Sequence, residues 1–241
     1  MSVARVPPAR PGGRHLLRSS GVARAIVAEA GIRAGDLVLD IGAGSGMLSA
    51  PLAAAGARVV AIEPDRRLAA RLRRAVPAAT VVEQRVEELD WPREPFRVVA
   101  NLPFSEAAAI CRALLSDPVV PLVSADLIVE WDFAVKRARV WPSTAQTVLW
   151  NAWWELAVAR RLDPGQFAPV PSVAGGVLRA RRRERPLVRP ADAAAFERFV
   201  RQGFRSSAAA RERDPHGWAH AFLTSGRMRS VPAVRRRGRA R

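Results

Sequence analysis

The sequence contains little cysteine, histidine or lysine. The shortage of cysteine argues against a disulfide, and the shortage of histidine argues against a metal site. The 241 residues include one cysteine, so no internal disulfide can form, and the apolar run around Cys111 predicts a small buried side chain. The three histidines, His15, His216 and His220, are too scattered to supply a metal site. We therefore expect neither a disulfide-stabilised protein nor a metal-dependent one.

Long apolar segments are missing as well. The first twenty residues contain four arginines and no apolar core of the length found in signal peptides. No uncharged run approaches the roughly 18 residues that a membrane-spanning helix needs. These absences predict a cytoplasmic protein that does not span a membrane.

Positive charge is present in excess. Lys136 is the only lysine, yet 39 basic residues stand against 22 acidic ones and the net charge is +17. Codon bias explains why arginine replaces lysine, but it does not explain the surplus of positive over negative charge. Guanidinium groups bind phosphate through paired hydrogen bonds, so the composition favours a nucleic-acid partner.

The order of predicted elements indicates the fold class. Buried strands alternate with helices from about residue 20 to residue 180, which predicts an α/β fold with a doubly wound, mostly parallel sheet. The first helix begins near Ser20 and ends at Gly31. Further along, residues 132–139 are predicted as a basic turn and residues 148–158 as a strand.

Composition changes near the end of this pattern. Residues 1–12 form an arm rich in proline, glycine and arginine, and residues 179–190 are predicted as a linker. Beyond the linker, apolar residues recur at helical spacing and predict the core face of a small helical domain over residues 183–232: Phe196, Phe199, Val200 and Phe204. Residues 233–241 are a basic tail.

A glycine-rich turn follows the first predicted strand, in the order V-L-D-I-G-A-G-S-G. Glycines at 42, 44 and 46 let the backbone turn sharply and approach a ligand, and Glu63 at the end of the next strand can accept both hydroxyls of a ribose. The spacing is G-x-G-x-G rather than the G-x-G-x-x-G of dinucleotide binders. Asp40, two residues before the first glycine, would repel a pyrophosphate but attract an α-ammonium. S-adenosylmethionine is therefore the favoured ligand; the alternative interpretation is a tight strand-to-helix turn with no ligand.

A second motif, Asn101-Leu102-Pro103-Phe104, ends the fourth predicted strand and faces the same crevice. The Asn101 side-chain oxygen and the Leu102 carbonyl can accept the two hydrogens of an adenine amine and direct its lone pair at a methyl group. Pro103 restricts the backbone of Leu102, and Phe104 offers a stacking face worth about 1–3 kcal/mol. Orientation and desolvation, rather than a dedicated base, would then carry the catalysis.

Four segments together, D-I-G-A-G-S-G, A-I-E, V-V-A-N-L-P-F and A-D-L-I-V-E-W-D-F-A-V-K-R-A, resemble the rRNA adenine-N6 methyltransferases. The likeness covers about residues 12–205 and is greatest to the actinobacterial Erm enzymes. It implies a Rossmann-like S-adenosylmethionine-dependent domain over residues 13–182, followed by the helical domain as an RNA-contacting unit. It also implies mono- or dimethylation of one adenine in 23S rRNA, before full ribosome assembly, by a monomer that confers macrolide-type resistance.

The resemblance assigns roles to individual positions. Asn101, Leu102 and Phe104 would be catalytic. The cofactor would be held by His15, Leu17, Asp40, Gly42, Gly44, Glu63, Arg85 and Asn101; for His15 the alternative is a surface histidine without a ligand. Independently of the resemblance, the position of Lys136, Arg137 and Arg139 after the fifth predicted strand favours contacts with RNA phosphates, and the alternative is a solvated face. Trp131 is the tryptophan expected near the site.

The chain departs from the family pattern at two places. G-R-H-L-L stands where the family has G-Q-N/H-F-L, so Arg14 replaces a glutamine. Gln84-Arg85 stands where the family has Gly-Asp, and arginine cannot accept the hydrogen bond that this Asp takes from the cofactor's adenine amine. The lost bond is worth about 1–3 kcal/mol, and Glu83 or Glu87 is the candidate replacement. Two alternatives remain open: an rRNA-binding protein with weakened catalysis, and a dimethyladenosine transferase acting on 16S rRNA.

Overall fold

The computed structural model describes residues 15–206 and 212–229. The predicted basic arm over residues 1–12, Arg14 and the basic tail over residues 233–241 lie outside this part of the chain.

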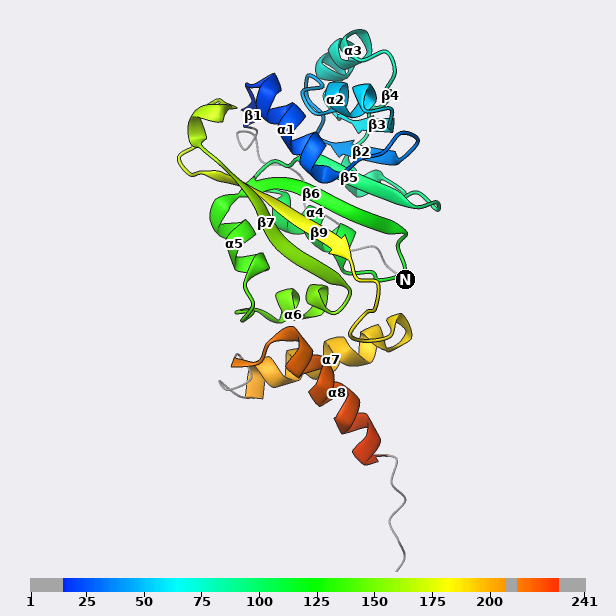
Figure 1. Ribbon diagram of the computed structural model, residues 1–241, viewed down its shortest axis with the longest axis vertical. Coiled ribbons are helices and arrows are strands. Elements are labelled where there is room, and N and C mark those ends of the chain that lie inside the picture. Colours follow the sequence, from blue (N-terminus) through cyan, green and yellow to red (C-terminus); the bar gives the residue numbers. More distant parts are fainter. Residues whose placement is uncertain (1–14, 207–211, 230–241) are drawn as a thin grey trace, which may run out of the picture.

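A seven-stranded sheet forms the centre of the molecule, in the order β4-β3-β2-β5-β6-β9-β7 (Figure 1). Strands β2 to β6 are parallel, whereas β9 runs antiparallel to both of its neighbours. The strands are β2 (Leu37–Ile41), β3 (Arg58–Ile62), β4 (Thr80–Val82), β5 (Phe96–Asn101), β6 (Leu122–Glu130), β7 (Trp154–Leu162) and β9 (Gly175–Arg182). Every residue of β2 is buried, as expected for a central strand covered on both faces. The predicted doubly wound, mostly parallel sheet is confirmed.

Helices cover the sheet, and two of them follow its last strand in the described part of the chain (Figure 1). They are α1 (Ser20–Ala30), α2 (Ser49–Ala54), α3 (Arg66–Ala75), α4 (Ala107–Leu115), α5 (Trp131–Ala138), α6 (Ala145–Asn151), α7 (Ala193–Ser206) and α8 (Pro215–Arg229). The sequence places the cap of the first helix at Ser20, but it is the side chain of Ser19 that accepts a hydrogen bond from the Val22 amide at the start of α1. Gly31 ends α1 in the left-handed conformation, as predicted.

Two predicted elements were wrong. Residues 132–139, expected to be a basic turn, lie almost entirely in helix α5, where Asp132 in the first turn and Lys136 in the last suit the helix dipole. Residues 148–158, expected to be one strand, divide into the end of α6 and the start of β7. Residues 147–154 are all buried, so their pattern has no period by which a helix could be told from a strand. Thr144 starts α6 by accepting a hydrogen bond from the Thr147 amide.

The carboxyl-terminal helices pack against α6 (Figure 1). Phe196 of α7 meets Trp153 edge to face, with ring centres 6.3 Å apart, and Trp218 of α8 belongs to the same apolar cluster. The predicted helical part after the sheet is confirmed, and Phe196 and Val200 form its buried face. Strand β9 continues to Arg182, so it includes the first four residues of the predicted linker.

A small antiparallel ribbon was not predicted. Strand β1 (Leu16–Leu17) pairs with β8 (Phe167–Ala168), and the His15 ring nitrogen Nδ1 lies 2.8 Å from the Pro169 carbonyl oxygen. This pairing holds the residues before α1 close to the carboxyl ends of the central strands, because Asn101 of β5 also contacts His15. Within the described residues, no helix is long and apolar enough to cross a membrane.

Candidate active site

The glycine-rich turn between β2 and α2 is held against the end of β3. Gly42 and Gly44 adopt positive φ angles of 73° and 58°, which side chains rarely allow. A Cβ on Gly44 would lie 3.1 Å from the Leu16 side chain, so the turn passes close to β1. The Gly44 amide donates to one carboxylate oxygen of Glu63 and the Asp65 amide to the other, both at 2.9 Å. Glu63 therefore lies beside the glycine turn, as the sequence predicts for a ribose-binding acid.

Asp40 lies at the base of this turn and is 1% exposed. Its carboxyl accepts a hydrogen bond of 2.6 Å from the Ser49 hydroxyl. Burial raises the pKa of Asp40 to about 7, the Ser49 hydrogen bond opposes this, and the charge of Glu63 adds to it. A positively charged group placed beside Asp40 would lower this pKa again, so the site suits an ammonium ligand.

The side-chain amide of Asn101, at the end of β5, forms a hydrogen bond with another described residue through its nitrogen but not through its oxygen. Its nitrogen Nδ2 donates to the His15 carbonyl oxygen at 2.7 Å. Because a carbonyl oxygen can only accept, this contact sets the orientation of the amide. The other atom, Oδ1, is buried and has no hydrogen-bond partner among the described residues. A buried acceptor left unpaired costs about 1–3 kcal/mol, which a donor on a ligand would recover.

The rest of the Asn101-Phe104 motif is fixed from two sides. The Leu102 amide donates to the Ile128 carbonyl of β6 at 3.1 Å, and Leu102 itself is buried. The Phe104 ring lies 5.3 Å from the His15 ring and 6.1 Å from the Phe167 ring, measured between centres. Together these three rings form an aromatic group beside Asn101, suited to stacking against a flat base.

Two small cavities meet at Gly42 and separate the predicted cofactor residues. Leu17, Asp40 and Asn101 line the first cavity, together with Leu16 and residues of the glycine turn. Arg85 lines the second, which is formed by the ends of β2 and β3, the turn after β4 and the start of α4. Glu63 and Gly44 are joined to the same turn by their hydrogen bond. His15 is not among the residues lining either cavity; its ring lies against Phe104 instead.

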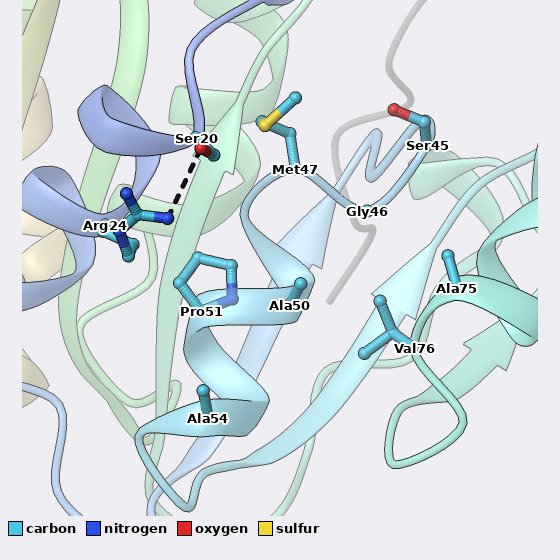
Figure 2. A pocket seen from close by; sticks show the side chains of 10 residues that line it. All are labelled: Ser20, Arg24, Ser45, Gly46, Met47, Ala50, Pro51, Ala54, Ala75 and Val76. Carbon is cyan, nitrogen blue, oxygen red and sulfur yellow. Dashed lines mark hydrogen bonds between the residues drawn. The ribbon is translucent and has the colours of Figure 1, made fainter.

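A larger hollow of about 410 Å³ adjoins the glycine turn and shares Ser45 and Met47 with the first cavity (Figure 2). Its walls are mostly apolar and come from α2, α3 and Met47, with Ser20 and Arg24 of α1 at one side, joined by a hydrogen bond of 3.4 Å. Among the described residues that line it, none is a carboxylate. No carboxylate is therefore available in this hollow to an ammonium or a ribose, whereas the two cavities at Gly42 adjoin Asp40, Glu63 and Asn101.

The structure separates the three basic residues predicted to bind RNA. Lys136 and Arg139 are exposed on α5 and just after it. Arg137, in contrast, is partly buried and donates to the hydroxyls of Thr144 and Thr147, both at 2.9 Å. This placement argues against a phosphate contact for Arg137, because its guanidinium joins α5 to α6.

Aromatic contacts and burial support this assignment. The Arg137 guanidinium lies 4.9 Å from the centre of the Phe133 ring and 5.3 Å from that of Trp150. Burial lowers the pKa of Arg137. Trp131, at the start of α5, likewise forms a cation–π contact, with the Arg161 guanidinium 5.1 Å from its ring centre.

Phe167 and Leu16 lie at the site although the sequence assigned them no role, whereas Glu87 was one of the two acids named as candidate acceptors. Phe167 contacts Phe104 across more than sixty residues of sequence, so no local pattern could have found it. Leu16 precedes α1 in a stretch without a clear period. In the described part of the chain, no group of three or more metal-ligating side chains comes together.

The cofactor implied by the glycine turn fits the residues present. Asp40 suits an ammonium, Glu63 suits a ribose, and the apolar side chains of the second cavity suit a flat heterocycle. The unpaired Oδ1 of Asn101 remains for a donor on a second substrate.

The sheet, the glycine turn after β2 and the helical carboxyl-terminal part together form a fold that is also found in S-adenosylmethionine-dependent methyltransferases. It resembles the crystal structure of the 23S rRNA methyltransferase ErmE with a TM-score of 0.71 and 28% identity, over 90% of this chain and 85% of that one. The chain belongs to the ribosomal RNA adenine dimethylase family, which matches residues 12–209.

Curated relatives are similar over most of the chain. The mycinamicin-resistance protein MyrB of Micromonospora griseorubida is 34% identical over 197 residues, 79% of this chain and 63% of that protein. The ribosomal RNA small subunit methyltransferase A of Magnetococcus marinus is 32% identical over 209 residues, 82% of this chain and 75% of that protein. The chain spans 66%, 63% and 55% of the length of three curated relatives, among them MyrB, so it is shorter than these proteins.

Proposed function

We propose that this protein transfers a methyl group from S-adenosylmethionine to the exocyclic amine of one adenine in 23S rRNA, and that the modification confers macrolide-type antibiotic resistance. The single observation that carries the proposal is the Asn101 amide, whose nitrogen is held by His15 while its buried oxygen has no partner among the described residues. An acceptor in this state suits a ligand that brings a hydrogen-bond donor.

Asn101, Leu102 and Phe104 would prepare the target amine for reaction. The Asn101 oxygen accepts one amine hydrogen and the Leu102 carbonyl the other, so the nitrogen lone pair points along the line of attack. Phe104 stacks on the base and offsets part of the few kcal/mol needed to flip an adenine out of its stack. The bound cofactor supplies an electrophilic methyl group on a sulfonium. The amine becomes acidic as the new bond forms, so its proton can leave to water and no residue is needed as a base.

Other residues would hold the cofactor so that its methyl group faces the target amine. Asp40 attracts its α-ammonium, Glu63 accepts its ribose hydroxyls, and Gly42 and Gly44 let the backbone pass close to it. Leu17 contributes an apolar wall, because it lines the same cavity as Asp40 and Asn101. His15 would act through its carbonyl oxygen, which orients Asn101 rather than touching the cofactor.

The RNA would be bound largely through its shape and its phosphates. The net charge of +17 supports a polyanionic partner. Lys136 and Arg139 are exposed beside the sheet domain, and Arg198, Arg201 and Arg205 line a shallow hollow on α7. We further expect a cytoplasmic monomer that acts on rRNA before the ribosome is fully assembled.

The name of ErmE supports the choice of 23S rRNA and that of MyrB supports a role in antibiotic resistance, whereas the small-subunit relative favours 16S rRNA. The test is a methyl-transfer assay with purified protein, S-adenosylmethionine and protein-free large-subunit rRNA. Small-subunit rRNA and assembled ribosomes are run in parallel, and the nucleosides are identified by mass spectrometry after digestion. N6-methyladenosine or N6,N6-dimethyladenosine in the large-subunit sample alone would support the proposal and give the number of methyl groups.

Two other outcomes would refute the proposal. Product in the small-subunit sample alone would identify a 16S dimethyladenosine transferase. Tight, salt-sensitive binding of rRNA without any product would identify an rRNA-binding protein that has lost catalysis.

A further inference from the structure

Glu87 has a buried carboxylate oxygen with no hydrogen-bond partner among the described residues. It lies in a short 3-10 turn, η1 (Val86–Glu88), directly after β4, and lines the second cavity at Gly42. The turn is closed by the Glu88 amide, which donates to the Arg85 carbonyl at 3.1 Å. A carboxylate oxygen that is removed from water without a donor is costly, so its position indicates a ligand donor.

The walls of this cavity indicate what kind of ligand carries that donor. Ile62, Val86, Pro103 and Ile110 present apolar side chains, and polar side chains line the remainder of the cavity. Apolar walls beside a carboxylate suit a flat heterocycle that carries an exocyclic amine. Among the purine rings of nucleosides, adenine has such an amine, whereas hypoxanthine has a carbonyl oxygen in the same place.

The position of the cavity relates it to the proposed cofactor. It includes Ile62 and Pro64, the residues on either side of Glu63, so a base in it would lie next to a ribose bound by Glu63. It also shares Gly42 with the cavity of Asp40 and Asn101, where the other end of the cofactor would lie.

We propose that Glu87 accepts the hydrogen bond from the adenine amine of the cofactor and so makes the site specific for an adenosyl group. This inference rests on the proposed function, because it assumes that S-adenosylmethionine is the cofactor. Arg85, which lines the same cavity, has no acceptor to offer.

Glu83, the other candidate in the sequence, has different partners. It is exposed and forms an ion pair with Arg73, and Arg66 approaches its second carboxylate oxygen at 3.9 Å. Glu83 is also absent from the residues described as lining the cavity. The structure therefore distinguishes two acids that the sequence alone left equivalent.

Two further polar side chains line the cavity and serve as matched controls. Gln84 is exposed, and Glu106 lies at the start of α4. If substituting Gln84 or Glu106, rather than Glu87, removed the preference for adenine, that residue would have the role proposed for Glu87.

The test measures binding alone, by calorimetry with full-length protein and two ligands that cannot be turned over. These are S-adenosylhomocysteine and S-inosylhomocysteine, which lacks the exocyclic amine. We expect the wild-type protein to prefer S-adenosylhomocysteine by about ten- to a hundredfold. Glu87→Ala should weaken binding of S-adenosylhomocysteine by a similar factor and abolish the preference. Gln84→Ala and Glu106→Ala should keep it.

Damage to the fold weakens the binding of both ligands alike. The ratio of the two affinities therefore still reports on the choice of base in a partly misfolded variant. An unchanged preference in Glu87→Ala, with S-adenosylhomocysteine still bound, would overturn the role of Glu87 and leave the proposed function intact. Loss of the preference in Gln84→Ala or Glu106→Ala alone would overturn it too. A wild-type protein that binds neither ligand would overturn the proposed cofactor, and this inference with it.

Discussion

Asp40→Asn should remove a pH dependence from the stability of the protein. Burial raises the pKa of the Asp40 carboxyl from 3.8 to about 7, so the folded protein holds this proton more tightly than the unfolded chain does. The carboxyl therefore favours folding fully below about pH 4, and this contribution is lost as the pH rises through 7. At about 1.4 kcal/mol per pH unit, the free energy of unfolding should fall by about 2.5 kcal/mol between pH 5 and pH 8 from this group.

Urea denaturation at pH 5 and pH 8 measures this effect directly. Asparagine retains an acceptor for the Ser49 hydroxyl but cannot ionise. Between pH 5 and pH 8, the free energy of unfolding should therefore fall by about 2.5 kcal/mol less in Asp40→Asn than in wild type. Equal losses in wild type and Asp40→Asn would refute the reasoning.

The same carboxyl should couple cofactor binding to proton release. A ligand ammonium beside Asp40 lowers its pKa, so binding near pH 6 expels the proton that the free protein holds there. Calorimetry of S-adenosylmethionine in two buffers of different ionisation enthalpy counts the protons released. We expect about one proton for wild type and none for Asp40→Asn; equal numbers would show that the ligand ammonium lies elsewhere.

Three further predictions concern single side chains. Asn101→Ala should lower kcat for methyl transfer by about 10²- to 10³-fold while leaving rRNA binding intact, as measured by single-turnover assay and filter binding. Gly203→Ala should lower the free energy of unfolding by about 1–2 kcal/mol in urea titrations, because the added methyl meets the buried Trp218 ring and this overpacking outweighs the usual helix gain. Arg137→Ala should destabilise the fold by about 1–3 kcal/mol, whereas Arg139→Ala should leave stability unchanged and reduce the slope of log Kd against log salt by about 0.7–0.9.

Each of these predictions has a contradicting outcome. Unchanged turnover in Asn101→Ala would contradict the role of its oxygen. Gly165→Ala is the control for Gly203→Ala, because a Cβ on Gly165 meets nothing within 4 Å, and equal stability of the two variants would contradict the packing argument. A lower salt slope in Arg137→Ala without loss of stability would restore Arg137 as a phosphate contact.

The sequence by itself determined the sheet and the chemical character of the site. The glycine turn, Glu63 and the Asn101-Phe104 motif each follow a short buried strand, and the carboxyl ends of parallel strands meet at one edge of a sheet. Their proximity therefore follows from patterns within a few residues and from the alternation of strands with helices. The buried face of α7, with Phe196 and Val200, follows from local periodicity in the same way.

Tertiary structure alone decided how the side chains at the site are paired. It showed that the His15 carbonyl orients the Asn101 amide, that Phe167 completes an aromatic group around Phe104, and that Glu87 rather than Glu83 faces the second cavity. It also showed that the Arg137 guanidinium donates to Thr144 and Thr147 and so joins α5 to α6, while its predicted contact with RNA stays a prediction. These contacts depend on where a side chain points and on what it meets from distant parts of the chain, and no pattern within a few residues records either.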